Sequence, residues 1–176
     1  MLMRGTGKHS YQQIRDEFDK LKARVNIGSG GGMGGGEPGA VNVGIETTKE
    51  NLVPVLRLVG EILKDPVFPA DEFDVLKKEQ LAQLEQQLSD PQALAFVSMF
   101  RRIMPYPADY VRYVPTIAEN IERTKGVTLD QVKDCYKKFY GAGHGEFAAV
   151  GDFDEAEVKK TIEELFGAWK SPGKFE

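Results

Sequence analysis

A run of glycines sets the strongest constraint on the fold of this chain. Seven of the nine residues from 28 to 36 are glycine, and only Ser29 and Met33 interrupt the run. Glycine loses more conformational freedom on folding than any other residue, which disfavours both a helix interior and a regular strand. The sequence therefore predicts a flexible loop over 28–39. Short alternating segments over 24–28 and 41–45 are expected to form a hairpin across it.

Most of the remaining chain carries apolar residues at helical spacing. Three predicted helices open with the pattern of a capping box, and the Asp-Pro pair at 90–91 is typical of an N-cap followed by proline at the first helical position. The three capping boxes are Ser10 with Gln13, Thr47 with Glu50, and Thr128 with Gln131. The expected helices cover about 10–23, 50–64, 71–88, 91–104, 117–121 and 128–140, and the apolar stripe of a final helix extends over 158–169. Leu88 is expected on the buried face of the helix over 71–88, and Phe139 on the apolar side of the helix over 128–140.

A third short strand is expected over 146–150, which is apolar and followed by the turn residues Gly151 and Asp152. Many helices with few strands, a hairpin and no β-α-β alternation indicate an α+β fold. We expect a two-layer domain with a mainly antiparallel sheet packed on one face by several helices. A length of 176 residues fits one domain over 1–176.

Composition excludes several classes of protein. The net charge of −4 comes from interspersed acidic and basic residues, so no nucleic acid is expected as a partner. No apolar run approaches the length of a bilayer span, so no membrane contact is expected of this soluble composition. No apolar signal segment follows Arg4. The compartment stays open, including export of the parent protein to a bacterial periplasm.

Two glycine patterns resemble nucleotide-binding motifs without meeting their requirements. Gly30, Gly32 and Gly35 have the spacing of a dinucleotide fingerprint, but a strand is predicted after them where that motif needs a helix. The Gly7-Lys8 pair is followed by His9, where a phosphate-binding loop needs serine or threonine. We therefore expect no bound cofactor.

Few residues could carry catalysis or bind a metal. His9 and His144 are far apart, and neither has a second ligand at helical metal-site spacing, so both are expected to be ordinary loop residues. Ser98 and Cys135 lack the glycine-flanked turn of a hydrolytic nucleophile. Cys135 is expected to be a small core residue. The prediction is no catalytic, no cofactor-binding and no metal-binding residue.

Eight short segments along the chain carry a family resemblance by their order. They are 1–6 (MLMRGT), 10–14 (SYQQI), 46–52 (ETTKENL), 65–69 (DPVFP), 89–91 (SDP), 139–141 (FYG), 149–154 (AVGDFD) and 165–169 (LFGAW). In this order they resemble the insulinase/pitrilysin family of zinc metallopeptidases. The match extends over nearly the whole chain.

The resemblance also implies where zinc should bind in a catalytic member. Two histidines and the general-base glutamate of an H-x-x-E-H motif precede the position that matches Met1. A glutamate ligand follows on the helix before the Asp-Pro restart, where this chain has Ala82 and Gln83. Glu79 and Glu85 are the nearest carboxylates and are expected to face other sides of that helix. The resemblance further implies that the first strands and first helix of the domain are missing.

The function implied is that of a non-catalytic domain of a zinc-dependent endopeptidase. Such a domain would form part of a chamber that encloses peptides, while a sister domain carries the zinc. The expected partners are sister domains of the same protease and peptide substrates. Two alternatives stay open: a structural or partner-binding family member without protease activity, and a truncated catalytic domain with a displaced zinc ligand.

Overall fold

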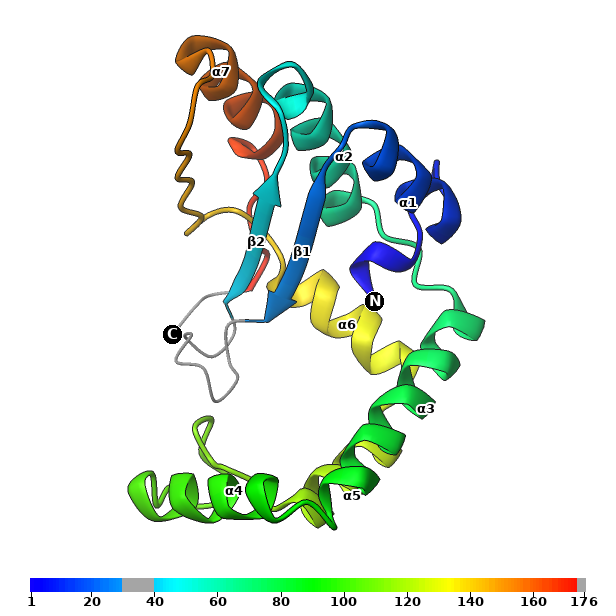
Figure 1. Cartoon of the computed structure of the whole chain (residues 1–176), viewed down its shortest axis with the longest axis vertical. Helices are drawn as coiled ribbons and strands as arrows, with labels where there is room; N and C mark the ends of the chain where they lie inside the picture. Colours follow the sequence, from blue (N-terminus) through cyan, green and yellow to red (C-terminus); the bar gives the residue numbers. More distant parts are fainter. Residues whose placement is uncertain (30–39, 174–176) are drawn as a thin grey trace. The chain divides into compact units, whose positions relative to one another are not determined.

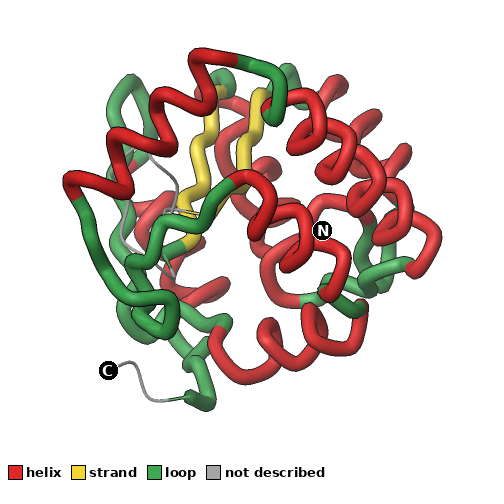
Figure 2. The backbone as a smooth tube through the Cα atoms, turned by 90° about the horizontal axis from the view of Figure 1, so that it is seen from below, coloured by secondary structure: helices red, strands yellow, loops and turns green. Residues whose placement is uncertain are grey.

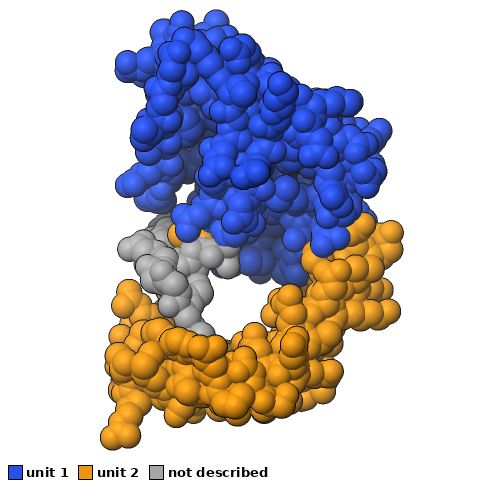
Figure 3. Space-filling view, in the orientation of Figure 1, with its two compact units in different colours: residues 1–28, 41–69, 130–176 blue, residues 29–40, 70–129 orange. Residues whose placement is uncertain are grey.

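The structure, a computed structural model, describes residues 1–29 and 40–173. These residues divide into two compact units, coloured separately in Figure 3. Unit 1 comprises 1–28, 41–69 and 130–176, and unit 2 comprises 29–40 and 70–129. Of the predicted glycine loop over 28–39, Gly28 and Ser29 belong to a strand and the rest lies outside the described residues.

Helices are the main regular secondary structure of the chain, as Figure 2 shows. The elements of unit 1 are η1 (Leu2–Arg4), α1 (Tyr11–Lys20), β1 (Arg24–Ser29), β2 (Val41–Glu46), η2 (Lys49–Asn51), α2 (Leu52–Lys64), α6 (Leu129–Phe139) and α7 (Glu155–Phe166). The elements of unit 2 are α3 (Ala70–Gln87), α4 (Pro91–Ile103) and α5 (Ile117–Gly126). The α+β class predicted from the sequence is confirmed.

The predicted hairpin is confirmed, because β1 and β2 pair as a two-stranded antiparallel sheet. Exposure alternates along β2, as the period-2 pattern requires. One face of the hairpin carries its apolar side chains toward the core of unit 1; these side chains are Val25, Ile27, Val43 and Ile45. The hairpin therefore covers that core with a single apolar face.

The third predicted strand is wrong for the described part of the chain. Residues 146–150 have no strand assignment, Phe147 is 48% exposed and the side chain of Val150 is completely exposed. A strand needs a neighbour to accept its backbone hydrogen bonds. The sheet in the described residues has only β1 and β2, so this apolar segment has no strand to pair with.

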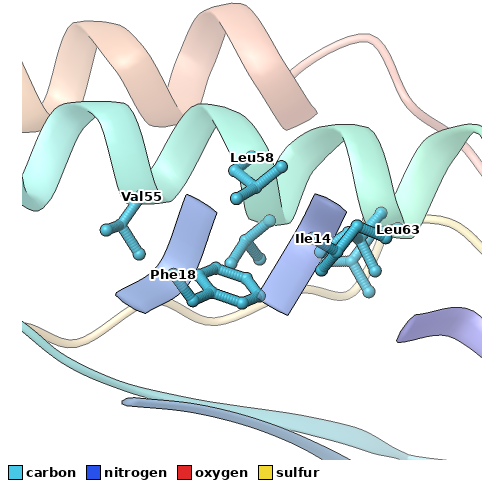
Figure 4. Packing of buried hydrophobic residues seen from close by; sticks show 7 residues of the cluster. Ile14, Phe18, Val55, Leu58 and Leu63 are labelled. Atoms are coloured by element: carbon cyan, nitrogen blue, oxygen red, sulfur yellow. The ribbon is translucent and has the colours of Figure 1, made fainter. Parts of the chain in front are cut away.

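The core of unit 1 forms where α1 and the hairpin meet α2. Ser10 caps α1 with the predicted capping box, and Ile14 and Phe18, one turn apart, face α2. Figure 4 shows these two side chains against Val55 and Leu63 of α2. In Figure 1, α2 runs between α1 and α7. Gly60 permits the close approach of α7, since a Cβ there would lie 2.9 Å from a methyl carbon of Leu165.

Unit 2 has a smaller core. Leu84 of α3 packs against Ile117 and Ile121 of α5, and Ala93 and Val97 of α4 pack at the edge of this cluster. Asp90 caps α4 by accepting a hydrogen bond from the backbone N–H of Gln92, as the Asp-Pro pair predicted. The predicted short helix at 117–121 extends to Gly126.

Three local predictions need correction. Thr47 does not cap α2, because its hydroxyl donates to the carbonyl of Leu21 and a 3₁₀ turn precedes the helix. Phe139, expected on the buried side of α6, is 56% exposed at the helix end. Leu88 is 45% exposed because α3 ends one residue before it. In the described ranges, no helix is both long and apolar enough to cross a bilayer.

Candidate functional site

The positions matched to the third zinc ligand lie on an exposed side of α3. Ala82 and Gln83 are both exposed, and neither has a carboxylate. The expectation that Glu79 points elsewhere is wrong: it lies four residues before Gln83 in a continuous helix, and such residues share a face. Glu85, two residues after Gln83, faces another side. In 1–29 and 40–173, no group of three His, Cys, Asp or Glu side chains could hold a metal ion.

A different cluster connects the segment after η1 to α2 through Thr6, His9 and Glu61. The hydroxyl of Thr6, a buried side chain, donates to the carboxylate of Glu61, and Nδ1 of His9 lies 2.8 Å from Oε1 of the same carboxylate. The Thr6 hydroxyl oxygen also accepts the backbone N–H groups of Lys8 and His9. Glu61 thus holds the tight turn over 6–9 through the side chains at its two ends, Thr6 and His9.

The electrostatics of Glu61 follow from these contacts. Burial by itself would raise the pKa of the Glu61 carboxyl, but the hydrogen bonds from Thr6 and His9 outweigh it and hold the pKa below its ordinary value. The carboxylate is therefore charged at neutral pH. His9, predicted to be an ordinary loop residue, instead makes a specific contact with α2.

This cluster borders a groove of about 530 Å³ that runs over the outer surface of α2. Its walls come from the turn at 8–9, from α1, from α2 and from Leu165 of α7. Two of its cations already have partners: Arg57 pairs with Glu164, and the Lys64 ammonium donates to the carbonyl of Leu165. The groove is thus a junction of three helices with mostly satisfied charges.

The groups at this groove do not form a nucleophilic centre. A serine- or threonine-type nucleophile needs its hydroxyl to donate to a base. The Thr6 hydroxyl donates to a carboxylate that also contacts His9, so the histidine lies beyond the carboxylate rather than beside the hydroxyl. The geometry supports a structural clamp.

The other residues singled out in the sequence add no ligand or nucleophile to this cluster in the described part of the chain. Cys135 is exposed on α6, which contradicts its predicted core position. His144 is exposed in the segment after α6. The backbone N–H of Gly7 donates to the carbonyl of Asp65, so the Gly7-Lys8 turn does not present a phosphate cradle. Gly30, Gly32 and Gly35 lie outside the described residues.

Sequence reasoning missed the role of Glu61 and a second polar cluster in unit 2. In that cluster, Arg101 of α4 donates to the hydroxyl of Tyr113 and to the carbonyl of Val114, and it lies 3.5 Å from Glu119. Glu119 also forms a capping box with Thr116. The T-x-x-E pattern at 116–119 is a sequence signal for this capping box. No sequence pattern indicates that Glu61 contacts Thr6 and His9.

Comparison with known proteins finds a family match in the C-terminal part of the chain. The family model described as the peptidase M16 inactive domain matches residues 126–176. No curated protein sequence matches the chain. The resemblance predicted from the sequence, to a non-catalytic domain of an insulinase-type metallopeptidase, is confirmed.

Solved structures share the fold along the whole chain. A peptidase M16 inactive domain from Pseudomonas fluorescens is 24% identical with a TM-score of 0.76, over 100% of this chain and 41% of its own. A protease from Helicobacter pylori is 16% identical with a TM-score of 0.77, over 97% and 39%. The first half of the periplasmic protease PqqL from Escherichia coli is 18% identical with a TM-score of 0.72, over 99% and 37%. The chain therefore spans about two fifths of the length of these proteins.

Proposed function

We propose that this chain serves as the non-catalytic domain of a zinc-dependent endopeptidase and forms part of the wall of a chamber that encloses peptide substrates. The single observation that carries the proposal is the match to an inactive peptidase domain. The exposed Ala82 and Gln83 agree with it, because neither supplies the carboxylate that zinc would need at that position. The zinc and the hydrolytic chemistry would belong to a sister domain of the same protein.

Both units are proposed to be parts of one such domain. The likeness to one solved chain, described as a peptidase M16 inactive domain, extends through both units, which supports keeping them in one domain over 1–176. The exposed apolar side chains of Phe147 and Val150 support a two-layer domain in which a further layer covers them.

One observation favours a second candidate, a catalytic domain with a displaced ligand. Glu79 shares the α3 face of Gln83, so a carboxylate lies one helical turn from the expected ligand position. The described residues offer no second and third ligand beside it, which favours the non-catalytic function.

The proposed function is tested with the purified chain, zinc chloride and a fluorogenic casein substrate. We expect no hydrolysis above the buffer rate, with or without added zinc, because the residues for metal-activated water are absent from the described ranges. Hydrolysis that 1,10-phenanthroline abolishes and zinc restores would show that the chain itself is catalytic. The Glu79→Gln variant is the matched control, since only a displaced-ligand enzyme would lose that activity.

A further inference from the structure

Helix α4 carries an apolar stripe that the described residues of unit 2 leave uncovered. Phe96, Met99 and Ile103 are 47%, 44% and 66% exposed. They are separated by three and four residues, so they form one line along the helix, here called the α4 stripe. The neighbouring side of α4 supplies Ala93 and Val97 to the core of unit 2. The stripe is therefore a second apolar side of α4, beside the one that packs.

Such a helix is unusual for a surface element. None of the 13 residues of α4 is buried, and its only charged residues are Arg101 and Arg102 in the last turn. A surface helix normally turns polar residues toward water and keeps one apolar side for the core. Apolar side chains aligned on an exposed face mark an interaction surface. The second apolar side of α4 fits a contact that the described residues do not supply.

The shape of the stripe identifies the kind of surface that would cover it. The stripe is a ridge of side chains on a helix whose backbone hydrogen bonds are already satisfied, so it offers no edge to an incoming strand. Helices pack by fitting ridges of this spacing into the grooves of another helix. An amphipathic helix is therefore a better fit than an extended peptide.

Charge around the stripe narrows the partner further. Asp109 is the only acidic residue between 91 and 113. Arg101 is held by Tyr113, Val114 and Glu119, whereas Arg102 and Arg112 are exposed and have no recorded partner in the described part of the chain. A partner helix with carboxylates beside its apolar ridge would complement this surface. A second copy of the chain would bring the same cations instead.

The size of the stripe indicates a tethered partner. A stable complex of two separate proteins buries about 800 Å² on each side, which three half-exposed side chains do not supply. Contacts between domains of one polypeptide can be smaller, because the linkage raises the effective concentration. The solved chains with this fold extend well beyond the matched part, which covers 41%, 39% and 37% of them.

We propose that the α4 stripe docks an acidic amphipathic helix from another domain of the same polypeptide. The proposal rests on the proposed function only in that this chain is one domain of a larger protein. It adds the surface of contact and the chemistry of its partner: an apolar ridge that covers Phe96, Met99 and Ile103, with carboxylates placed for Arg102 and Arg112.

The test uses two synthetic helical peptides with the same leucine ridge, one flanked by glutamates and one by lysines. Fluorescence anisotropy measures their binding at low salt, with the chain titrated to millimolar concentration because an untethered contact of this size is weak. Binding of neither peptide in that range would also overturn the proposal. The glutamate peptide should bind at least about tenfold more tightly than the lysine peptide, the preference falling with salt. Ile103→Ser removes apolar area that the bound peptide would bury, so it should weaken binding by about tenfold. Leu94→Ser is the matched control, because Leu94 is 45% exposed on another side of α4.

Both side chains are exposed, so neither substitution should change the thermal unfolding temperature. An unchanged unfolding temperature shows that both variants are folded. Equal binding of the two peptides, or equal loss in Ile103→Ser and Leu94→Ser, would overturn the proposal. So would self-association of the chain that Ile103→Ser abolishes, which would make a second copy the partner. The absence of hydrolysis by the chain does not depend on the stripe, so the peptidase assay and the peptide titration can fail separately.

Discussion

The two units differ in how they hold themselves together. Unit 1 has a deep apolar core in which the side chains of Ile14, Val55 and Ile62 have no exposed surface. Among residues 70–129 of unit 2, only Leu84, Ile117 and Ile121 are buried apolar side chains. Free energy from apolar burial grows with the area removed from water, so unit 1 should be the more stable unit.

This difference agrees with different roles in a larger protein. A unit with a larger buried core depends less on outside contacts for its stability. A unit with a small core and an uncovered apolar side, as in the α4 stripe, gains stability when a partner covers it. Unit 2 is therefore expected to become more stable when the α4 stripe is covered.

The largest effect is expected in the core of unit 1. Ile62→Ala should lower the free energy of unfolding by about 2–5 kcal/mol, because it leaves a cavity at a site with 0% exposure. Urea unfolding followed by circular dichroism measures it. Ile103→Ala, at a 66% exposed site, is the matched control and should change stability by less than about 0.5 kcal/mol. Equal effects of the two would remove the contrast between core and surface.

A smaller and local effect is expected in unit 2. Leu84→Ala should cost about 2–3 kcal/mol, at the low end for buried leucine, because the cluster around it is small and can relax. Hydrogen exchange should accelerate in α3, α4 and α5 while α1 and α2 keep their protection. Faster exchange in both units would show that they unfold together, which would contradict the expected difference in stability between unit 1 and unit 2.

The clamp at Glu61 predicts a pH dependence in unit 1. Its pKa in the folded chain lies below the ordinary value of 4.5, so the stabilisation is complete above that pH and is lost as the pH falls through the lowered folded pKa. Glu61→Gln should cost about 1–2 kcal/mol at neutral pH. It should also flatten the acid limb of the stability curve. If the acid limb of the stability curve stays the same in Glu61→Gln, the ionised Glu61 carboxylate does not stabilise the folded chain.

The smallest effect is expected at the polar cluster of unit 2. Arg101→Gln removes the hydrogen bonds to Tyr113 and Val114 from an exposed guanidinium. Solvent screening makes such contacts weak, so global stability should hardly change, while exchange over 104–116 should become faster. Unaltered exchange in that segment would show that the cluster does not order it.

Local sequence signals predicted much of the fold. The hairpin, the capping box at Ser10 and the start of α4 after Asp90 follow from residues close together in the chain. Errors arose where a distant partner decides the outcome. Residues 146–150 read as a strand but have no neighbour in the sheet, and Thr47 bonds the distant carbonyl of Leu21 instead of capping α2.

The candidate site was predictable to a lesser degree. The positions of Ala82 and Gln83 on an exposed helix face follow from the predicted helix and the family resemblance. The contact of His9 with Glu61 joins residues 52 positions apart, and no local pattern announces such a pair. Glu79 was expected to face another side of α3, but it shares a face with Gln83, because residues four apart lie on one side of a helix.

Zinc content tests the central claim, that this chain is a non-catalytic domain, most directly. The purified chain is incubated with excess zinc, dialysed against metal-free buffer and analysed by inductively coupled plasma mass spectrometry, beside the Glu79→Gln variant. The account predicts far less than one zinc per chain in both samples, since the described residues form no ligand group. One zinc per chain, lost in Glu79→Gln, would contradict it.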